Sequence, residues 1–135
     1  MNIELLDIPK IHDTRGNIAV IEKQLLPFPM NRVYYLFDVP STARRGGHAH
    51  KEQFELLIPL SGSFDVVLND GNETQKVTLN KPDKGLIIKS NTWRELDNFS
   101  SGSICLVISS GEFIEEDYIR DFNEFKIYLQ SNRKL

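Results

Sequence analysis

The chain has 135 residues, enough for one domain, and its 16 Lys and Arg nearly balance its 19 Asp and Glu. Proteins that bind nucleic acid through its phosphates carry an excess of basic residues, so this balance argues against that partner. No apolar run approaches the roughly 20 residues that a membrane-spanning helix needs, and the first residues do not resemble a signal peptide. We therefore expect one domain over residues 1–135 in the cytoplasm, without a nucleic-acid or membrane partner. The lone Cys105 lies in an apolar run and is expected to be a buried thiol.

Short apolar runs separated by turn residues predict a series of β-strands. The runs span residues 18–21, 33–37, 54–60, 64–68, 75–79, 85–88 and 104–108. Asp70-Gly71 lies between two of them and predicts a tight hairpin, because such turns need residues with positive φ. Close, even spacing without intervening helices predicts an all-β sandwich or barrel.

The C-terminal residues follow a different pattern. From Glu115 onward, apolar residues recur at helical spacing at Ile119, Phe122, Phe125 and Leu129. This pattern predicts one amphipathic helix that packs its apolar stripe on the β structure or on a partner. The polar residues 130–135 are expected to fray.

Two histidines, His48 and His50, lie two residues apart, which places both imidazoles on one face of a strand. A single buried histidine is usually structural, whereas such a pair more often binds a metal or transfers protons. The spacing from His48 and His50 to Glu55 and then Gly62 is similar to the first motif of the cupin superfamily. Thr42 stands where that motif usually opens with glycine, so the similarity is partial there.

The second cupin motif ends in a histidine followed four residues later by asparagine. Here Arg94 stands at the position of that histidine, and Asn98 is retained. A guanidinium has no lone pair to give a metal and repels a divalent cation, so the sequence favours a metal-free site without a cofactor. A metal-dependent oxygenase or isomerase that uses His48, His50 and Glu55 stays an alternative, because two histidines and one carboxylate suffice for non-haem iron.

A more specific resemblance extends over nearly the whole chain. It is carried in order by residues 11–16, 31–37, 45–51, 93–95, 98–100 and 117–122, and the strings at 45–51 and 117–120 are the most specific. Together they resemble the dTDP-4-keto-6-deoxyglucose 3,4-ketoisomerases, nucleotide-sugar cupins of the WxcM-like C-terminal domain type. The resemblance implies an all-β cupin double-stranded β-helix, or jelly-roll barrel, with one C-terminal amphipathic helix. It also implies no metal and a homodimer with a swapped N-terminal strand.

The reaction implied by the resemblance moves the ketone of dTDP-4-keto-6-deoxy-D-glucose from C4 to C3 through an enediol. The product, a dTDP-3-keto-6-deoxyhexose, would feed the synthesis of 3-amino-3,6-dideoxy sugars. Two imidazoles that titrate near neutrality suit such proton transfers. By resemblance, His48 transfers the proton between the carbons and His50 shuttles one between O3 and O4. A cupin that binds nucleotide sugars without turnover stays an alternative.

Further residues are expected to bind the substrate or the enediolate. Arg94 and Tyr35 are candidate donors to the enediolate, although Tyr35 could equally be a residue of the barrel rim. A pyrophosphate needs several N–H donors. The predicted substrate site consists of Arg15, Arg32, Arg45, Glu55, Trp93 and Asn98, with core packing as the alternative for Trp93.

Two positions bear on the product's configuration. In the family that the chain resembles, the residue before the glycine of the Asp-x-Arg-Gly segment is Arg or Tyr, and the residue after the active-site Trp is His or Arg. These choices correlate with a gluco or galacto product. Here Arg15 and Arg94 form a mixed pair, and Arg94 favours gluco.

Overall fold

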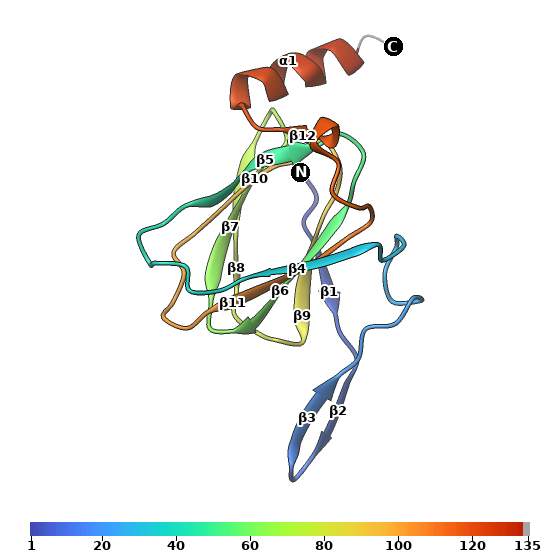
Figure 1. Cartoon of the computed structure of the whole chain (residues 1–135), viewed down its shortest axis with the longest axis vertical. Helices are drawn as coiled ribbons and strands as arrows, with labels where there is room; N and C mark the ends of the chain where they lie inside the picture. Colours follow the sequence, from blue (N-terminus) through green and yellow to red (C-terminus); the bar gives the residue numbers. More distant parts are fainter. Residues whose placement is uncertain (134–135) are drawn as a thin grey trace.

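Two five-stranded antiparallel sheets face each other and form a barrel (Figure 1). The computed structural model describes residues 1–133. One sheet has the order β1-β9-β6-β11-β4 and the other β12-β5-β10-β7-β8. The strands are β1 (Glu4–Asp7), β2 (Lys10–Asp13), β3 (Gly16–Ala19), β4 (Arg32–Leu36), β5 (Arg45–His50), β6 (Glu55–Ser61), β7 (Phe64–Asn69), β8 (Thr74–Leu79), β9 (Lys84–Ile88), β10 (Trp93–Asp97), β11 (Ile104–Ser109) and β12 (Tyr118–Ile119).

The cupin-type all-β architecture with a single C-terminal helix is confirmed. The predicted hairpin forms, because β7 and β8 pair in register from Phe64 opposite Leu79 to Asn69 opposite Thr74. Gly71 in its turn has φ +95°, the left-handed region that favours glycine.

The main core fills the space between the two sheets. Leu57, Leu86 and Ile88 of the first sheet pack with Phe64 and Val66 of the second, and all five are buried. Because side chains alternate along a strand, Leu56 and Ile58 point to the other face of β6. There they join a second cluster that includes Leu26 and Phe28 from the segment before β4.

The C-terminal helix begins later than predicted. Glu115–Asp117 form one 3₁₀ turn, and β12 follows, with Tyr118 and Ile119 paired to His50 and Ala49 of β5. The helix α1 (Phe122–Arg133) starts after Asp121, whose carboxylate accepts a hydrogen bond from the Glu124 backbone N–H. Strand pairing therefore overrides the helical spacing at Ile119.

The end of the helix also differs from the expectation. Residues 130–133, predicted to fray, are part of α1, and residues 134–135 lie outside the described residues. Phe125 of the helix packs with Trp93 and Ile119 beneath it, which attaches α1 to the end of the barrel.

The hairpin β2–β3 projects from the barrel (Figure 1). Ile11 and Ile18 lie opposite each other on it and are 59% and 61% exposed. Cys105 of β11 is fully buried, as expected, and burial raises the pKa of its thiol to about 12. Among the described residues, no helix is long and apolar enough to cross a membrane.

Candidate active site

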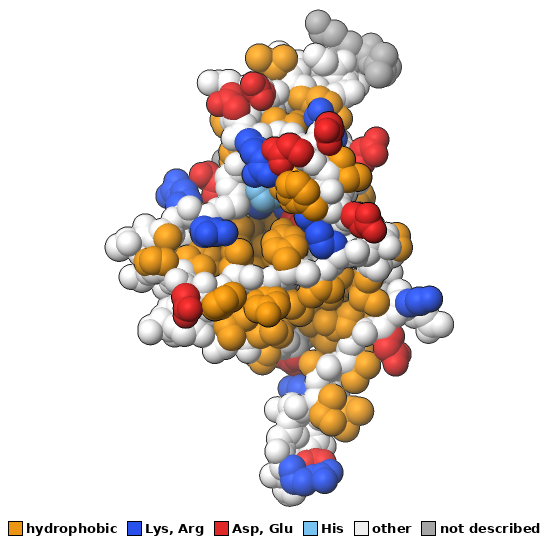
Figure 2. All heavy atoms as spheres, in the orientation of Figure 1, with side chains coloured by type: hydrophobic (Ala, Val, Ile, Leu, Met, Phe, Trp, Pro, Cys, Tyr) orange, Lys and Arg blue, Asp and Glu red, His pale blue; other side chains and the backbone are white. Residues whose placement is uncertain are grey.

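A cavity of about 360 Å³ lies between the two sheets and is also lined by Tyr118 of β12. Figure 2 shows histidine atoms in a hollow of the surface, with Lys and Arg side chains around it. One part of the cavity lining is apolar and includes Leu36, Leu57 and Leu96. Polar side chains two residues away on the same strands form another part, so the lining changes from apolar to polar along the strands.

The period of two along each strand brings the polar groups to this cavity. Tyr34 precedes Leu36 by two residues on β4, Glu55 precedes Leu57 on β6, and Arg94 precedes Leu96 on β10; all of them line the cavity. On β5, Gly46 and His48 share the inward face. Gly46 has φ +77°, and a Cβ there would lie 3.1 Å from Leu96 Cδ1, so glycine allows β5 to approach β10 closely.

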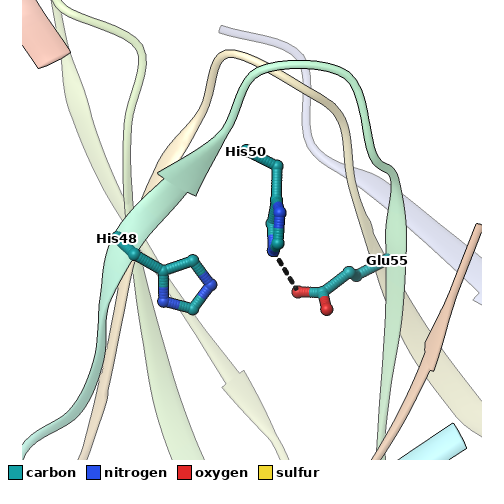
Figure 3. Close-up of side chains that lie close together, drawn as sticks. All are labelled: His48, His50 and Glu55. Carbon is teal, nitrogen blue, oxygen red and sulfur yellow. Dashed lines mark ion pairs between the residues drawn. The ribbon is translucent and has the colours of Figure 1, made fainter. Parts of the chain in front are cut away.

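His48 and His50 lie side by side at the inner wall (Figure 3). Their ring centroids are 4.9 Å apart, with the rings nearly perpendicular. His48 lines the cavity, whereas the fully buried His50 lies just behind the wall with Nε2 3.6 Å from Glu55 Oε1. Within residues 1–133, neither Nε2 atom has a hydrogen-bond partner, although both atoms are buried.

Glu55 forms the centre of a buried polar network. Arg94 Nη1 donates to its Oε1 at 2.6 Å, and the Tyr34 hydroxyl donates to its Oε2 at 2.7 Å. Burial alone would raise the pKa of this carboxyl, but His50, Arg94 and Tyr34 outweigh burial and lower the pKa to about 2. Burial, with the charge of Glu55, raises the pKa of Tyr34 well above its usual value. Glu55 is therefore ionised and Tyr34 is neutral at neutral pH.

His48 experiences the opposite electrostatic environment. Burial, together with the positive charge of Arg94 and the neighbouring His50, lowers the pKa of His48 to about 3. The imidazole is thus neutral at neutral pH and carries a lone pair that can accept a proton. The low pKa of His48 differs from the expectation that this imidazole titrates near neutrality.

The segment 117–120 closes the site from behind. Asp117 Oδ2 lies 2.9 Å from His50 Nδ1, and the Tyr118 ring lies with its centroid 4.4 Å from that of His50 and 5.0 Å from that of His48. Arg120 stacks on Tyr118, with its Cζ 4.3 Å from the ring centroid, and lines the cavity. The strand β12 therefore brings a carboxylate, an aromatic ring and a cation to the histidine pair.

The cavity mouth is basic. Arg32, Arg45 and Arg120 line it together with Phe113. Arg32 donates to the Tyr118 hydroxyl and to Gln53 Oε1, both at 3.2 Å, which holds its guanidinium in place. These groups could bind an anion such as a pyrophosphate.

The three candidate metal ligands do converge. Single ligand atoms of His48, His50 and Glu55 lie within 4.8 Å of one another. However, the guanidinium of Arg94 occupies the Glu55 oxygen nearest His50, and Arg32 lies 3.8 Å from the other oxygen. A divalent cation there would be adjacent to two fixed positive charges. This donor set fits a proton-transfer site better than a metal site.

Several predicted site residues lie elsewhere. Tyr35 is 60% exposed on the outer face of β4, and Tyr34 takes the predicted place in the cavity. Trp93 packs under α1 against Phe122 and Phe125. Asn98 donates to Asp65 at 3.0 Å, outside the cavity lining.

Arg15 lies far along the chain's projecting hairpin. Its side chain is 88% exposed and pairs with Asp13 of the same turn, so it does not reach this chain's cavity. The residues that the structure brings together as predicted are His48, His50, Glu55, Arg94, Arg32 and Arg45.

Sequence reasoning did not find Tyr34, Gln53, Phe113, Asp117, Tyr118 and Arg120. A signal existed for Tyr34, because Arg32 was expected to face the site and a residue two positions later shares its face. The string 117–120 was noticed only for its resemblance, without assigned roles. No local pattern points to Gln53 or Phe113, because their positions depend on distant strands.

Comparisons with known proteins agree with this geometry. The family model described as "FdtA: WxcM-like, C-terminal" matches residues 1–130. The chain belongs to this family. It is 40% identical over 130 residues to the TDP-4-oxo-6-deoxy-alpha-D-glucose-3,4-oxoisomerase of Aneurinibacillus thermoaerophilus, covering 96% of this chain and 94% of that protein.

Solved structures show the same fold. The WlaRB TDP-quinovose 3,4-ketoisomerase of Campylobacter jejuni is 43% identical with a TM-score of 0.88, over 93% of this chain and 98% of that one. A mutant of the 3,4-ketoisomerase QdtA of Thermoanaerobacterium thermosaccharolyticum, solved in complex with TDP-4-keto-6-deoxyglucose, is 34% identical with a TM-score of 0.93. The latter match covers 96% of this chain and 95% of that one. These relatives are sugar 3,4-ketoisomerases, and the resemblance seen in the sequence is confirmed.

Proposed function

We propose that the protein is a sugar 3,4-ketoisomerase that converts TDP-4-keto-6-deoxyglucose to a TDP-3-keto-6-deoxyhexose. The observation that carries the proposal is the neutral His48 in the cavity wall, backed by His50 and by the Glu55–Arg94 pair. The named activities of the relatives support the substrate class. No step requires a metal or a cofactor.

His48 is the base in this proposal. The carbonyl at C4 acidifies the C3 hydrogen, and the neutral imidazole accepts that proton while O4 is protonated to give the enediol. His48 then returns its proton to C4 as O3 loses one, which leaves the carbonyl at C3. A base that is uncharged at working pH suits the first step.

His50 is the candidate to move the proton between O3 and O4. Its Nε2 points toward Glu55, which lines the cavity, so a sugar bound against Glu55 would bring O3 and O4 near this atom. Arg94, Tyr34 and the cavity's fixed charge would stabilise the enediolate as preorganised donors. Arg32, Arg45 and Arg120 at the mouth suit the pyrophosphate.

The deciding experiment follows the carbonyl by NMR after TDP-4-keto-6-deoxyglucose is added. The wild-type protein should give a 3-keto product and incorporate solvent deuterium at C4, whereas His48→Asn and His50→Asn should lower the rate by about 10²–10⁴-fold. His12→Asn is the matched control, since His12 lies on the exposed hairpin. A wild-type ketone that stays at C4 would refute the proposal. Binding without turnover would favour the non-catalytic alternative, and activity lost with a chelator and restored by metal would favour the metal-dependent one.

We also propose a homodimer that exchanges the hairpin β2–β3. The exposed Ile11 and Ile18 would be buried by a second copy, and Arg15 at the hairpin would be carried to the partner's surface. Sedimentation analysis should give a dimer, and Ile11→Asp with Ile18→Asp should shift it to monomer. A wild-type monomer at micromolar concentration would contradict this proposal.

Two finer assignments complete the proposal. Arg94 in the cavity wall and the 43% identity to a TDP-quinovose isomerase favour a gluco product, which the coupling constant of H4 in the product reports. The cytoplasm is the proposed location, where such an activity would feed 3-amino-3,6-dideoxy sugar synthesis, and residues 1–135 would act as one catalytic unit.

A further inference from the structure

Asp117 is a buried carboxylate that touches the histidine pair from outside the cavity. Its Oδ2 lies 2.9 Å from Nδ1 of His50, and only 8% of the residue is exposed. It contacts the Nδ1 side of His50, whereas Glu55, which lines the cavity, lies on the Nε2 side. Any effect on the reaction must therefore pass through His50.

The backbone fixes the orientation of this carboxylate. Asp117 Oδ1 accepts the Glu52 N–H at 2.8 Å, and Oδ2 accepts the Gln53 N–H at 3.3 Å. In addition, the Lys51 N–H donates to the Asp117 carbonyl oxygen at 2.8 Å. Asp117 is thus tied to the turn that follows His50 on β5, and its position relative to the imidazole is set by the fold.

A carboxylate can only accept hydrogen bonds, so the short contact requires a proton on Nδ1 of His50. In a neutral imidazole the lone pair is then on Nε2, the atom that faces Glu55, and Glu55 lines the cavity. When Nε2 receives a proton, the ring becomes a cation, and the Asp117 charge stabilises it at 2.9 Å. His48 has no such carboxylate at 2.9 Å among the described residues, which makes the two histidines chemically different.

We propose that Asp117 is a positioning residue that holds the proton on Nδ1 of His50, so that Nε2 is free to exchange protons with the substrate oxygens. This inference rests on the proposed ketoisomerase function and assigns a role to the first residue of the string 117–120. In serine proteases a comparable carboxylate orients the catalytic histidine, and its replacement by asparagine lowers kcat about 10⁴-fold.

The test compares Asp117→Asn with Glu116→Gln. Glu116 is the neighbouring carboxylate of the same 3₁₀ turn but is exposed, so it controls for loss of one negative charge. We expect Asp117→Asn to lower kcat at least 100-fold while the Kd for TDP changes less than about 3-fold. Glu116→Gln should change both less than about 2-fold. A kcat of Asp117→Asn within about 3-fold of wild type would overturn the proposal, and so would an equal loss of TDP binding, which would indicate a structural role.

A second measurement does not depend on turnover, and its wild-type result does not depend on the folding of a variant. ¹⁵N-edited NMR distinguishes protonated from unprotonated ring nitrogens, and the chain has 3 histidines, so His50→Asn identifies the His50 signals. Wild-type His50 should carry its proton on Nδ1, and Asp117→Asn, where folded, should move it partly or wholly to Nε2. A wild-type proton on Nε2 alone would overturn the inference. If the wild-type protein does not move the ketone, the proposed function fails while this measurement still decides the Asp117–His50 contact.

Discussion

The two ends of the barrel interior are built from the same strands but carry opposite chemistry. On β4, β6 and β10, one step of two residues along the inward face leads from Leu36, Leu57 and Leu96 to Tyr34, Glu55 and Arg94. The apolar end stabilises the fold by burying side chains, whereas the polar end buries charges that need partners. A polar site of this kind thus requires only that the inward-facing residues at one end of these strands are polar instead of apolar.

The stability of the polar end depends on ion pairing between its side chains more than on the burial of apolar surface. Glu55 and Arg94 are each about 1% exposed and form an ion pair with each other. Such a pair contributes little relative to an apolar pair, but removal of one partner leaves a buried charge uncompensated. The two ends should therefore respond differently to substitution, in stability and in activity.

Replacing Glu55 with alanine should have the largest effect. We expect a loss of about 3–5 kcal/mol in the free energy of unfolding, because Arg94 keeps its charge without a partner. Urea unfolding measures the loss, and the ketoisomerase assay should show a fall in kcat as well. Glu55→Gln also removes the charge but keeps the hydrogen-bonding shape, so it should lose somewhat less of both; a loss below about 1 kcal/mol in Glu55→Gln would contradict the role given to the charge.

At the apolar end, Leu86→Ala should also destabilise the protein, by about 2–5 kcal/mol. Leu86 is fully buried between the sheets but does not line the cavity. Activity per folded molecule should therefore stay near the wild-type value at a temperature well below the unfolding midpoint. A fall in kcat comparable to that of Glu55→Ala would show that the two ends are not separable.

Lowering the pH should reduce the free energy of unfolding through the buried titratable groups of the polar end. The pKa of His48 is about 3 in the folded protein and 6.5 in the unfolded chain. Between these two pH values the unfolded chain binds a proton at His48 and the folded protein does not. Glu55 behaves in the same direction, because its pKa of about 2 lies below 4.5, and its contribution is lost as pH falls from 4.5 toward 2. Each group should lower the free energy of unfolding by up to about 1.4 kcal/mol per pH unit within its window.

Urea unfolding at pH 7, 6, 5 and 4 measures this slope. His48→Asn should flatten the curve between pH 6.5 and 4.5 and reduce the slope below pH 4.5 to the contribution of Glu55. An unchanged slope between pH 6.5 and 4.5 in this variant would contradict the assignment to His48.

The smallest effect distinguishes two adjacent tyrosines. Tyr34→Phe removes the hydrogen bond to Glu55 and should cost about 0.5–1.5 kcal/mol, with a lower kcat. Tyr35→Phe changes an exposed side chain on the other face of β4 and should leave stability and kcat nearly unchanged. A lower kcat in Tyr35→Phe together with an unchanged kcat in Tyr34→Phe would instead support Tyr35 as the donor to the enediolate.

The features that depend on local patterns were predictable from the sequence. The β7–β8 hairpin, the inward pair His48 and His50, and the replacement of a metal-binding histidine by Arg94 each follow from residue type and spacing. The start of α1 was not predictable in this way, because the pairing of Tyr118 with His50 joins residues far apart in the chain.

The missed site residues have the same origin. Asp117 approaches His50 only because β12 adds to the edge of β5, and Gln53 meets Arg32 only through the β4–β11–β6 order. Alternation along β4 places Tyr34, not Tyr35, on the same face as Arg32. Long-range strand order thus decides the electrostatic environment, and a single sequence does not encode it in any local spacing.

The single buried cysteine can report on the opening of the first sheet. Cys105 lies on β11, which pairs with β6 on one side and with the edge strand β4 on the other, and its buried thiol is protected while that sheet is closed. A thiol reagent therefore labels only molecules in which these strands have separated, and the labelling rate reports how often that happens. The protein carries this label site without an engineered residue, on a different sheet from the histidine pair of β5.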